Sequence, residues 1–239
     1  MAISVTNIGV NANTTGATVA ITVPAGGVPV GALICLTSSE STNSFPPGSV
    51  ADTASNTYAE VISARRSDGP TGFGSIFYAW NVAALVSGNT ITYTKVASGA
   101  RTAISAFYAT GILTISDPLD SAATASAFGT GVSPSVTSGT PSVAGDLFVA
   151  AVIFGGNHSF TQDTGHGWAT PFNESASGAT STDACVDGGN QINPGTGTKI
   201  YAPTINNIDW AALICAFKAA ANNQPPYQPW AQRGPMLAS

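Results

Sequence analysis

Hydrophobic residues along this chain follow two patterns, and both are typical of β-strands. In the segments 19–23 and 90–95, apolar and polar residues alternate, which predicts strands with one buried and one exposed face. Three further segments are continuously apolar: Leu33–Leu36, Leu147–Phe154 and Ala211–Phe217. Because these runs are short and lie near glycine, proline or asparagine residues, we expect buried strands rather than helices. The pattern therefore predicts an all-β fold.

The second half of the chain repeats the plan of the first. Four short blocks recur in the same order, at a nearly constant offset of 108 to 114 residues. The pairs are Gly31–Leu36 with Gly145–Ala150, Asp52–Thr53 with Asp163–Thr164, Thr90–Tyr93 with Thr198–Tyr201, and Ala103–Phe107 with Leu213–Phe217. We therefore expect a jelly-roll-like β-sandwich over residues 1–220, built from duplicated halves at about 1–115 and 135–220, each contributing strands to both sheets. Two small sandwiches are the alternative.

Two connecting segments need their own interpretation. Residues 116–143 join the halves and are rich in glycine and serine, but Phe128 and Val132 provide apolar side chains to bury. We interpret this segment as a crossover that contains a strand; a flexible linker between two domains is the alternative. Residues 81–86 form the only segment that suggests a helical turn.

The composition changes sharply after Lys218. Prolines at positions 225, 226, 229 and 235 remove backbone donors and favour polyproline II, so residues 221–239 are predicted to form an extended arm outside the sandwich. Large side chains in this arm have no core of their own, and we expect them to bind another subunit. The expected partner-binding residues are Tyr227, Trp230, Arg233, Met236 and Leu237. The alternatives are an arm that folds back on its own domain and a chance resemblance of Pro-Pro-Tyr to a proline-motif ligand.

The chain is poor in charge for its length. Charged residues make up 8% of the sequence, against roughly a quarter in an ordinary globular domain, which favours a protein of an assembly or of the extracellular space. With 7 Lys and Arg residues and a net charge of −5, nucleic acid is not an expected partner. No apolar run is long enough to predict a membrane span. Met1–Ser4 do not resemble the start of a secretion signal, so we expect folding in a reducing cytosol.

Three cysteines are an odd number, and their spacing does not match a metal site. Cys35 and Cys215 lie in apolar runs, where a thiol behaves as a small hydrophobic residue. We expect both to be buried, reduced and structural, because burial disfavours the thiolate. Cys185 lies in a segment of polar composition and is predicted to be a more reactive loop residue.

The residues with potential chemistry do not form a recognisable catalytic motif. His158 and His166 lie near Asp163 in a glycine-rich segment, but their spacing matches no zinc pattern. We therefore expect neither a metal site nor an acid–base site there. The sequence also lacks a nucleophile elbow, a phosphate loop and a dinucleotide fingerprint, so we expect no enzymatic activity and no cofactor.

A second group of polar side chains, Asp183, Asp187 and Asn190, lacks the frame of a calcium loop. We predict a turn-rich loop in this region. The spacing of the glutamates does not support a glycosidase pair: Glu40, Glu60 and Glu174. Three tryptophans flank strand runs and are expected to pack in the core or at its rim rather than to form sugar platforms: Trp80, Trp168 and Trp210.

Several of these segments together resemble a known type of module. They are Ile21–Leu33, Asp52–Tyr58, Trp80 and Ile91–Thr94, and the second half continues the likeness through Ala144–Ala151. Over about residues 1 to 220, the chain resembles a β-sandwich module of tailed-bacteriophage virion proteins and some bacterial surface proteins. Ala32 departs from the pattern, because an acidic residue is more usual before the leucine, whereas Asp146 keeps that residue in the second half. The resemblance implies a type of module rather than one position in the virion, and it implies no catalytic residues.

The function implied by the resemblance is that of a virion structural protein, made in the host cytoplasm and assembled into a phage particle. We expect a capsid decoration (cement) protein on the outside of the head that binds other virion proteins and forms a homo-oligomer. A tail or fibre component is the alternative. A further alternative is a carbohydrate-binding or adhesin module, for which aromatic side chains would gather on one exposed face.

Overall fold

The computed structural model of this protein describes residues 2–45, 47–66, 72–169, 172–175, 183–193 and 195–221. Within these ranges the protein is all-β, and its strands pair in antiparallel sheets. The helical elements there are two short 3₁₀ turns, Ser121–Ala123 and Thr164–His166. The predicted all-β class, with sheets packed as in a β-sandwich, is confirmed.

The first half of the chain forms one five-stranded sheet and one three-stranded sheet. The five-stranded sheet has the order β1 (Ser4–Asn13), β8 (Arg101–Thr110), β3 (Leu33–Ser41), β6 (Phe73–Ala79) and β5 (Ala59–Arg65). The three-stranded sheet has the order β2 (Thr18–Thr22), β7 (Thr90–Thr94) and β4 (Ser49–Asp52).

The second half forms another five-stranded sheet and two strand pairs. The sheet has the order β13 (Phe172–Ser175), β14 (Cys185–Ile192), β11 (Leu147–Phe154), β17 (Ile208–Phe217) and β9 (Ala125–Gly131). The pairs are β10 (Val136–Thr137) with β15 (Ile200–Tyr201), and β12 (Phe160–Thr161) with β16 (Thr204–Ile205). In both five-stranded sheets the first strand of the half lies beside its last strand, followed by the third, sixth and fifth.

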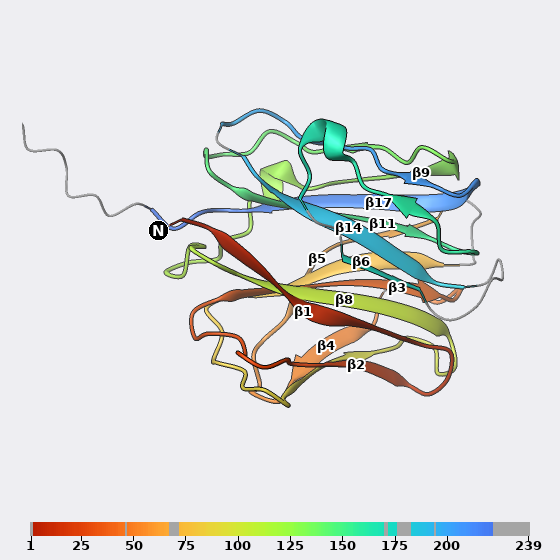
Figure 1. Cartoon of the computed structure of the whole chain (residues 1–239), viewed down its shortest axis with the longest axis horizontal. Helices are drawn as coiled ribbons and strands as arrows, with labels where there is room; N and C mark the ends of the chain where they lie inside the picture. The colour runs from red at the N-terminus through yellow and green to blue at the C-terminus, as the bar shows by residue number, and fades with distance from the viewer. Residues whose placement is uncertain are drawn as a thin grey trace, which may run out of the picture.

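The two five-stranded sheets stack face to face, and the smaller strand groups cover their outer faces (Figure 1). A central core lies between the sheets, with Cys35, Tyr78 and Phe107 from the first half against Leu213, Cys215 and Phe217 from the second. A separate core lies between each five-stranded sheet and its outer strands. The two halves therefore share one core and each also has its own.

This layering explains the two hydrophobic patterns in the sequence. The three continuous apolar runs lie in β3, β11 and β17, whose residues are buried on both faces because each five-stranded sheet is covered on both sides. The alternating segments form β2 and β7, which lie on the outside of the stack, so only one face of each strand is buried. The strand predictions for these five segments are confirmed.

The predicted assignment of strands to sheets is wrong. Each five-stranded sheet comes from one half of the chain, so the halves do not contribute strands to both. β9, which precedes the predicted start of the second half at about residue 135, pairs with β17 over all of its seven residues. Residues 116–143 do contain strands, as predicted, but the two side chains expected to be buried are exposed. Phe128, on the edge strand β9, is 68% exposed, and Val132 is 47% exposed.

The helical turn predicted at 81–86 is absent from the structure. Val82 and Leu85 are buried in the core of the first half, and their backbones pair with other segments instead. The Leu85 N–H donates to the Val28 carbonyl at 3.0 Å, and the Val82 N–H donates to the Ala32 carbonyl at 3.2 Å. These long-range bonds hold the segment against the connection between β2 and β3.

Candidate functional site

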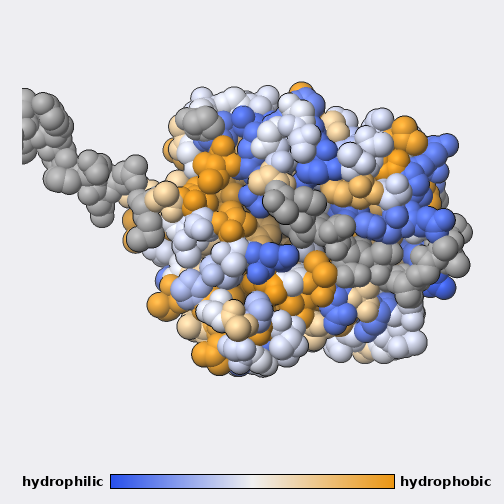
Figure 2. Space-filling model, viewed as in Figure 1, coloured by the Kyte–Doolittle hydropathy of each residue, from blue (hydrophilic) through white to orange (hydrophobic). Residues whose placement is uncertain are grey.

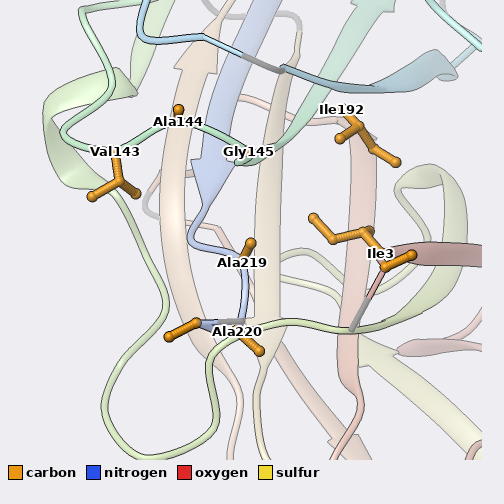
Figure 3. Close-up of a pocket in the computed structure, with 9 residues that line it drawn as sticks. Ile3, Val143, Ala144, Gly145, Ile192, Ala219 and Ala220 are labelled. Atoms are coloured by element: carbon orange, nitrogen blue, oxygen red, sulfur yellow. The ribbon is translucent and has the colours of Figure 1, made fainter. Parts of the chain in front are cut away.

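An apolar groove lies at one end of the stack, where the first and last described residues of the chain meet. It has a volume of about 530 Å³, and all nine of its lining residues are alanine, glycine, valine or isoleucine. In Figure 3, Ile3 and Ile192 lie on one side, Val143 lies on the other, and Ala219 lies between them. Segments from four separate parts of the sequence therefore build one hydrophobic surface.

Backbone hydrogen bonds fix the walls of this groove. Ala219 forms a β-bridge with Ile112, and the Ala220 N–H donates to the Gly111 carbonyl at 2.8 Å. On the other side, the Gly145 N–H donates to the Asn193 carbonyl at 2.7 Å, which ties the turn before β11 to the end of β14. Because residues 219–221 are alanines with small side chains, the described residues leave the space between the walls unfilled.

The groove is exposed hydrophobic surface. Val143 and Ile192 are 43% and 48% exposed. Figure 2 shows hydrophobic residues on the surface at the same end of the molecule, and Figure 1 places the N-terminus there. Residues 222–239 continue the chain from Ala221, which is itself a lining residue. Exposed apolar surface rimmed by polar residues is typical of contact with another molecule.

Two buried carboxyl groups lie next to the groove. Asp146 follows Gly145 of the groove wall, and Asp146 and Asp120 are both almost fully buried. Burial raises the pKa of Asp120, but hydrogen bonds from the Ser142 N–H and hydroxyl outweigh it, so this pKa lies below its usual value. Burial, and then the hydrogen bond and the charge of Asp120, raise the pKa of Asp146 to about 7. Asp146 therefore keeps its proton in weak acid, next to the charged Asp120 carboxylate.

This carboxyl pair makes stability depend on pH. The folded protein keeps the Asp146 proton up to about pH 7, whereas an unfolded chain releases it near pH 4, at about the ordinary pKa of aspartate. The stabilising contribution is therefore present in acid and is lost as the pH rises from about 4 to 7. The pKa of Asp120 is lowered, so its effect on stability has the opposite pH dependence. Its stabilising contribution is present at neutral pH and is lost as the pH falls through this lowered pKa.

We expect Asp146→Asn to remove this loss of stability, because an amide side chain does not titrate and stays neutral next to Asp120 at every pH. Urea unfolding at pH 5 and pH 8 measures the effect. Between these pH values the variant should gain about 1 to 2 kcal/mol relative to wild type, which is less than full linkage because the two groups titrate together. Parallel pH dependences of wild type and variant would show that Asp146 is ionised throughout this range.

The predicted partner-binding residues Tyr227, Trp230, Arg233, Met236 and Leu237 lie outside the described residues. Their role therefore stays a prediction. The groove and the Asp120–Asp146 pair were not predicted as sites. The one signal for them in the sequence is the Gly-Asp-Leu block at 145–147, which marks Asp146 but not its partner.

The structure places the two histidines on different carboxylates. His166 Nδ1 lies 2.8 Å from Asp163 Oδ1, and His158 Nε2 lies 2.8 Å from Asp187 Oδ1. His158 also stacks on Phe154, with 6.0 Å between the ring centroids. Across the described ranges, no group of three His, Cys, Asp or Glu side chains is arranged to hold a metal ion.

Asp163 instead organises a turn through its carboxylate, as Asp52 also does in the first half. The Asp52 carboxylate accepts hydrogen bonds from the Ala54 and Asn56 N–H groups. The Asp163 carboxylate accepts them from the His166 and Ala202 N–H groups. The matching Asp-Thr blocks thus mark two similar turns rather than a chemical site.

The turn-rich loop predicted around Asp187 and Asn190 is wrong, because these residues lie in β14. Asp183, just before this strand, is fully buried and forms an ion pair with Arg101 of β8. Asp187 is also buried and pairs with His158. Both partners are distant in sequence, so the polar composition of this segment did not indicate that it forms a buried strand.

Cys35 and Cys215 are fully buried, as predicted, and burial raises the pKa of both thiols. The prediction for Cys185 is wrong: this residue is buried in β14, and its thiol donates to the Gly156 carbonyl at 3.6 Å. No disulfide joins the three cysteines. We therefore expect all three thiols to be protected from reagents in the folded protein.

The glutamates do not form a carboxylate pair in the described residues. Glu40 is buried and accepts hydrogen bonds from the Tyr93 hydroxyl at 2.9 Å and from the Ala97 N–H at 3.1 Å, which is a structural role. Glu60 is exposed on β5, and the side chain of Glu174 lies outside the described part.

The packing predicted for the tryptophans is confirmed for Trp168 and Trp210, which are buried in the core of the second half. Trp80 is only partly buried and packs against the central core.

Comparisons with protein-family models, with curated proteins and with solved structures find no match for this chain. Among the described residues, no helix is long and apolar enough to cross a membrane. The function is therefore inferred from the sequence and from the geometry of the molecule.

Proposed function

We propose that this protein is a structural component of a phage virion, and specifically a decoration protein on the outside of the head. The observation that carries the proposal is the apolar groove at the point where the proline-rich segment 222–239 continues from Ala221. The hydrophobic groove and the large side chains of residues 222–239 are thus joined by the chain at one end of the stack. With 8% charged residues, the chain is also poorly equipped to stay dispersed as a free monomer.

The proposed attachment uses the groove together with Tyr227, Trp230, Arg233, Met236 and Leu237. Each large apolar side chain that becomes buried contributes roughly 1.5 to 3 kcal/mol. Proline restricts the unbound segment and so reduces the entropy lost on binding. The partners are other virion proteins, including further copies of this chain. The role needs contacts alone and no enzymatic step.

The proposal includes an origin of the halves by duplication, in a jelly-roll-like fold. It is supported by the same strand order in the two five-stranded sheets and by the matching Asp-Thr blocks, in each of which the aspartate organises a turn. Two such units would add area to the surface of a particle, while the contacts that attach the protein stay at the end of the stack that carries the groove.

Truncation after Ala221 tests the attachment. It keeps the β-bridge of Ala219 and the hydrogen bond of Ala220, so we expect the stack to fold with an unchanged melting temperature. Incorporation into particles, measured by mass spectrometry of purified virions, should be lost. Normal incorporation of the truncated protein would overturn the proposed role of the segment.

A matched pair of substitutions tests the groove itself. Val143→Asp places a charge in the groove, and Val86→Asp places the same charge on a valine that is also exposed but lies elsewhere. We expect the first to reduce incorporation at least tenfold and the second to leave it unchanged. Equal effects of the two substitutions would show that the groove has no special part in attachment.

A further inference from the structure

A second cavity lies away from the groove, beside the edge strand β5 of the first half. It is formed by the turn between β4 and β5, the residues after β6 and the segment after β8, and its lining includes Ser55, Tyr78, Trp80, Asn81 and Asp117. Its volume of about 580 Å³ falls within the range of about 300 to 1,000 Å³ that is usual for small-molecule sites.

Trp80 gives this cavity an aromatic surface. The side chain is partly buried and packs against the central core, which restricts the ring, and Trp80 also lines the cavity. Within the described ranges, the indole N–H has no hydrogen-bond partner. A fixed ring with an apolar face and an unpaired donor suits a ligand that combines C–H surface with oxygen atoms.

Two polar groups beside Trp80 can accept or donate further hydrogen bonds. The Asp117 carboxylate is held by the Tyr78 hydroxyl, 2.9 Å from each oxygen, and by the Leu119 N–H at 2.9 Å. Since a carboxylate has about four acceptor positions, it keeps capacity for a ligand hydroxyl. The Asn81 side-chain amide has no hydrogen-bond partner in the described part of the chain.

The backbone around the cavity is strained at two positions. Ser55 and Asn81, with φ of +60° and +50°, are the only non-glycine residues in the described ranges that have a positive φ. Both line this cavity. Such conformations are unfavourable for residues with a Cβ and tend to occur at functional sites.

The lining contains no Lys, Arg or His and a single carboxylate, so it does not suit an anionic ligand. We propose that this cavity binds a neutral sugar, whose C–H face packs on the Trp80 indole and whose hydroxyls bond to Asn81 and Asp117. Tyr78 is a positioning residue, because its hydroxyl orients Asp117. This site does not depend on the proposed virion role.

Saturation-transfer NMR on the full chain tests the proposal. The probes are methyl glucoside, methyl galactoside, N-acetylglucosamine, maltose and lactose, with sialic acid and choline as the anionic and cationic comparisons. At least one neutral sugar should bind saturably and shift the indole N–H signal of Trp80, which is assigned with Trp80→Phe. Absence of saturable binding by all the neutral sugars, or binding of choline or sialic acid alone, would overturn the proposal.

Three variants locate the binding. Trp80→Ala should weaken it at least tenfold, whereas Trp80→Phe should retain part of it because a ring remains. Asn81→Gly removes the amide but keeps a residue that accepts the positive φ, so it should weaken binding without lowering the melting temperature. Phe128→Ala removes another exposed aromatic ring and serves as the control. Full affinity in both Trp80→Ala and Asn81→Gly would place the sugar elsewhere and contradict the site.

Discussion

Phe217→Ala should lower the free energy of unfolding by about 3 to 5 kcal/mol, as expected for loss of a fully buried aromatic ring. Phe217 lies in β17 of the second half, is fully buried, and contacts the Tyr78 ring of the first half with 5.3 Å between the centroids. Because it belongs to the central core, the cavity opens between the halves. Urea unfolding gives the magnitude, and hydrogen exchange shows where protection is lost.

The location of the lost protection is the informative part of this experiment. If the halves share one cooperative core, amides in β6 of the first half should lose protection together with those in β11 of the second. The control is Phe128→Ala, at an exposed position, where the change should stay within about 0.5 kcal/mol. Unchanged protection of β6 in Phe217→Ala would mean that the halves unfold independently.

Gly74→Ala should be the second strongly destabilising change, by about 1 to 3 kcal/mol. A Cβ at Gly74 in β6 would overlap Cγ1 and Cδ1 of Ile153 in β11 and lie 2.9 Å from the Ser38 carbonyl oxygen. The side chain of Ile153 therefore fills the space that a Cβ at Gly74 would occupy, so the two sheets pack closely at this point.

A double-mutant cycle tests this contact. Ile153→Ala removes the overlapping atoms, so Gly74→Ala should cost less in that background, with a coupling energy of about 1 to 2 kcal/mol. Gly72→Ala is not a suitable control, because a Cβ there would meet the Arg66 guanidinium. Gly99→Ala is the better comparison for surface effects, since a Cβ there meets no atom within 4 Å, although its φ of +83° adds a local cost. Strict additivity of Gly74→Ala and Ile153→Ala would contradict the packing of the two sheets.

The sequence predicted strands well where their hydrophobic pattern follows from burial. Runs such as Leu147–Phe154 have no polar side, because both faces of the strand are covered, and β2 alternates because only one face is. The arrangement of these strands could not be predicted. A continuous apolar run does not indicate which sheet the strand belongs to. For this reason we wrongly expected each half to contribute strands to both sheets.

β14 shows why some segments were missed. Its residues include Asp187, two glycines and Asn190, a composition typical of turns. Asp187 is nevertheless buried because His158, distant in sequence, provides its partner. Cys185 was predicted to lie in a polar loop for the same reason. Burial of a polar segment can be predicted only when the residue that pairs with its polar side chain is known, and that residue is known only from the fold.

The two cavities could not be predicted for a related reason. Each is assembled from short segments that are far apart in the sequence, such as Ile3, Val143 and Ile192 in the groove. None of these residues forms a motif by itself. In the cavity beside β5, Trp80 was expected to pack in the core or at its rim; it packs against the central core and also lines the cavity.

Electron cryomicroscopy of particles released by cells that encode this protein tests the proposed function most directly. We predict density for the two stacked sheets at regular positions on the outside of the head, joined to the shell at the end that carries Ile3, Val143 and Ile192. Particles that carry the truncation after Ala221 should lack this density. Density confined to the tail, or particles without the protein, would contradict the proposed decoration of the head.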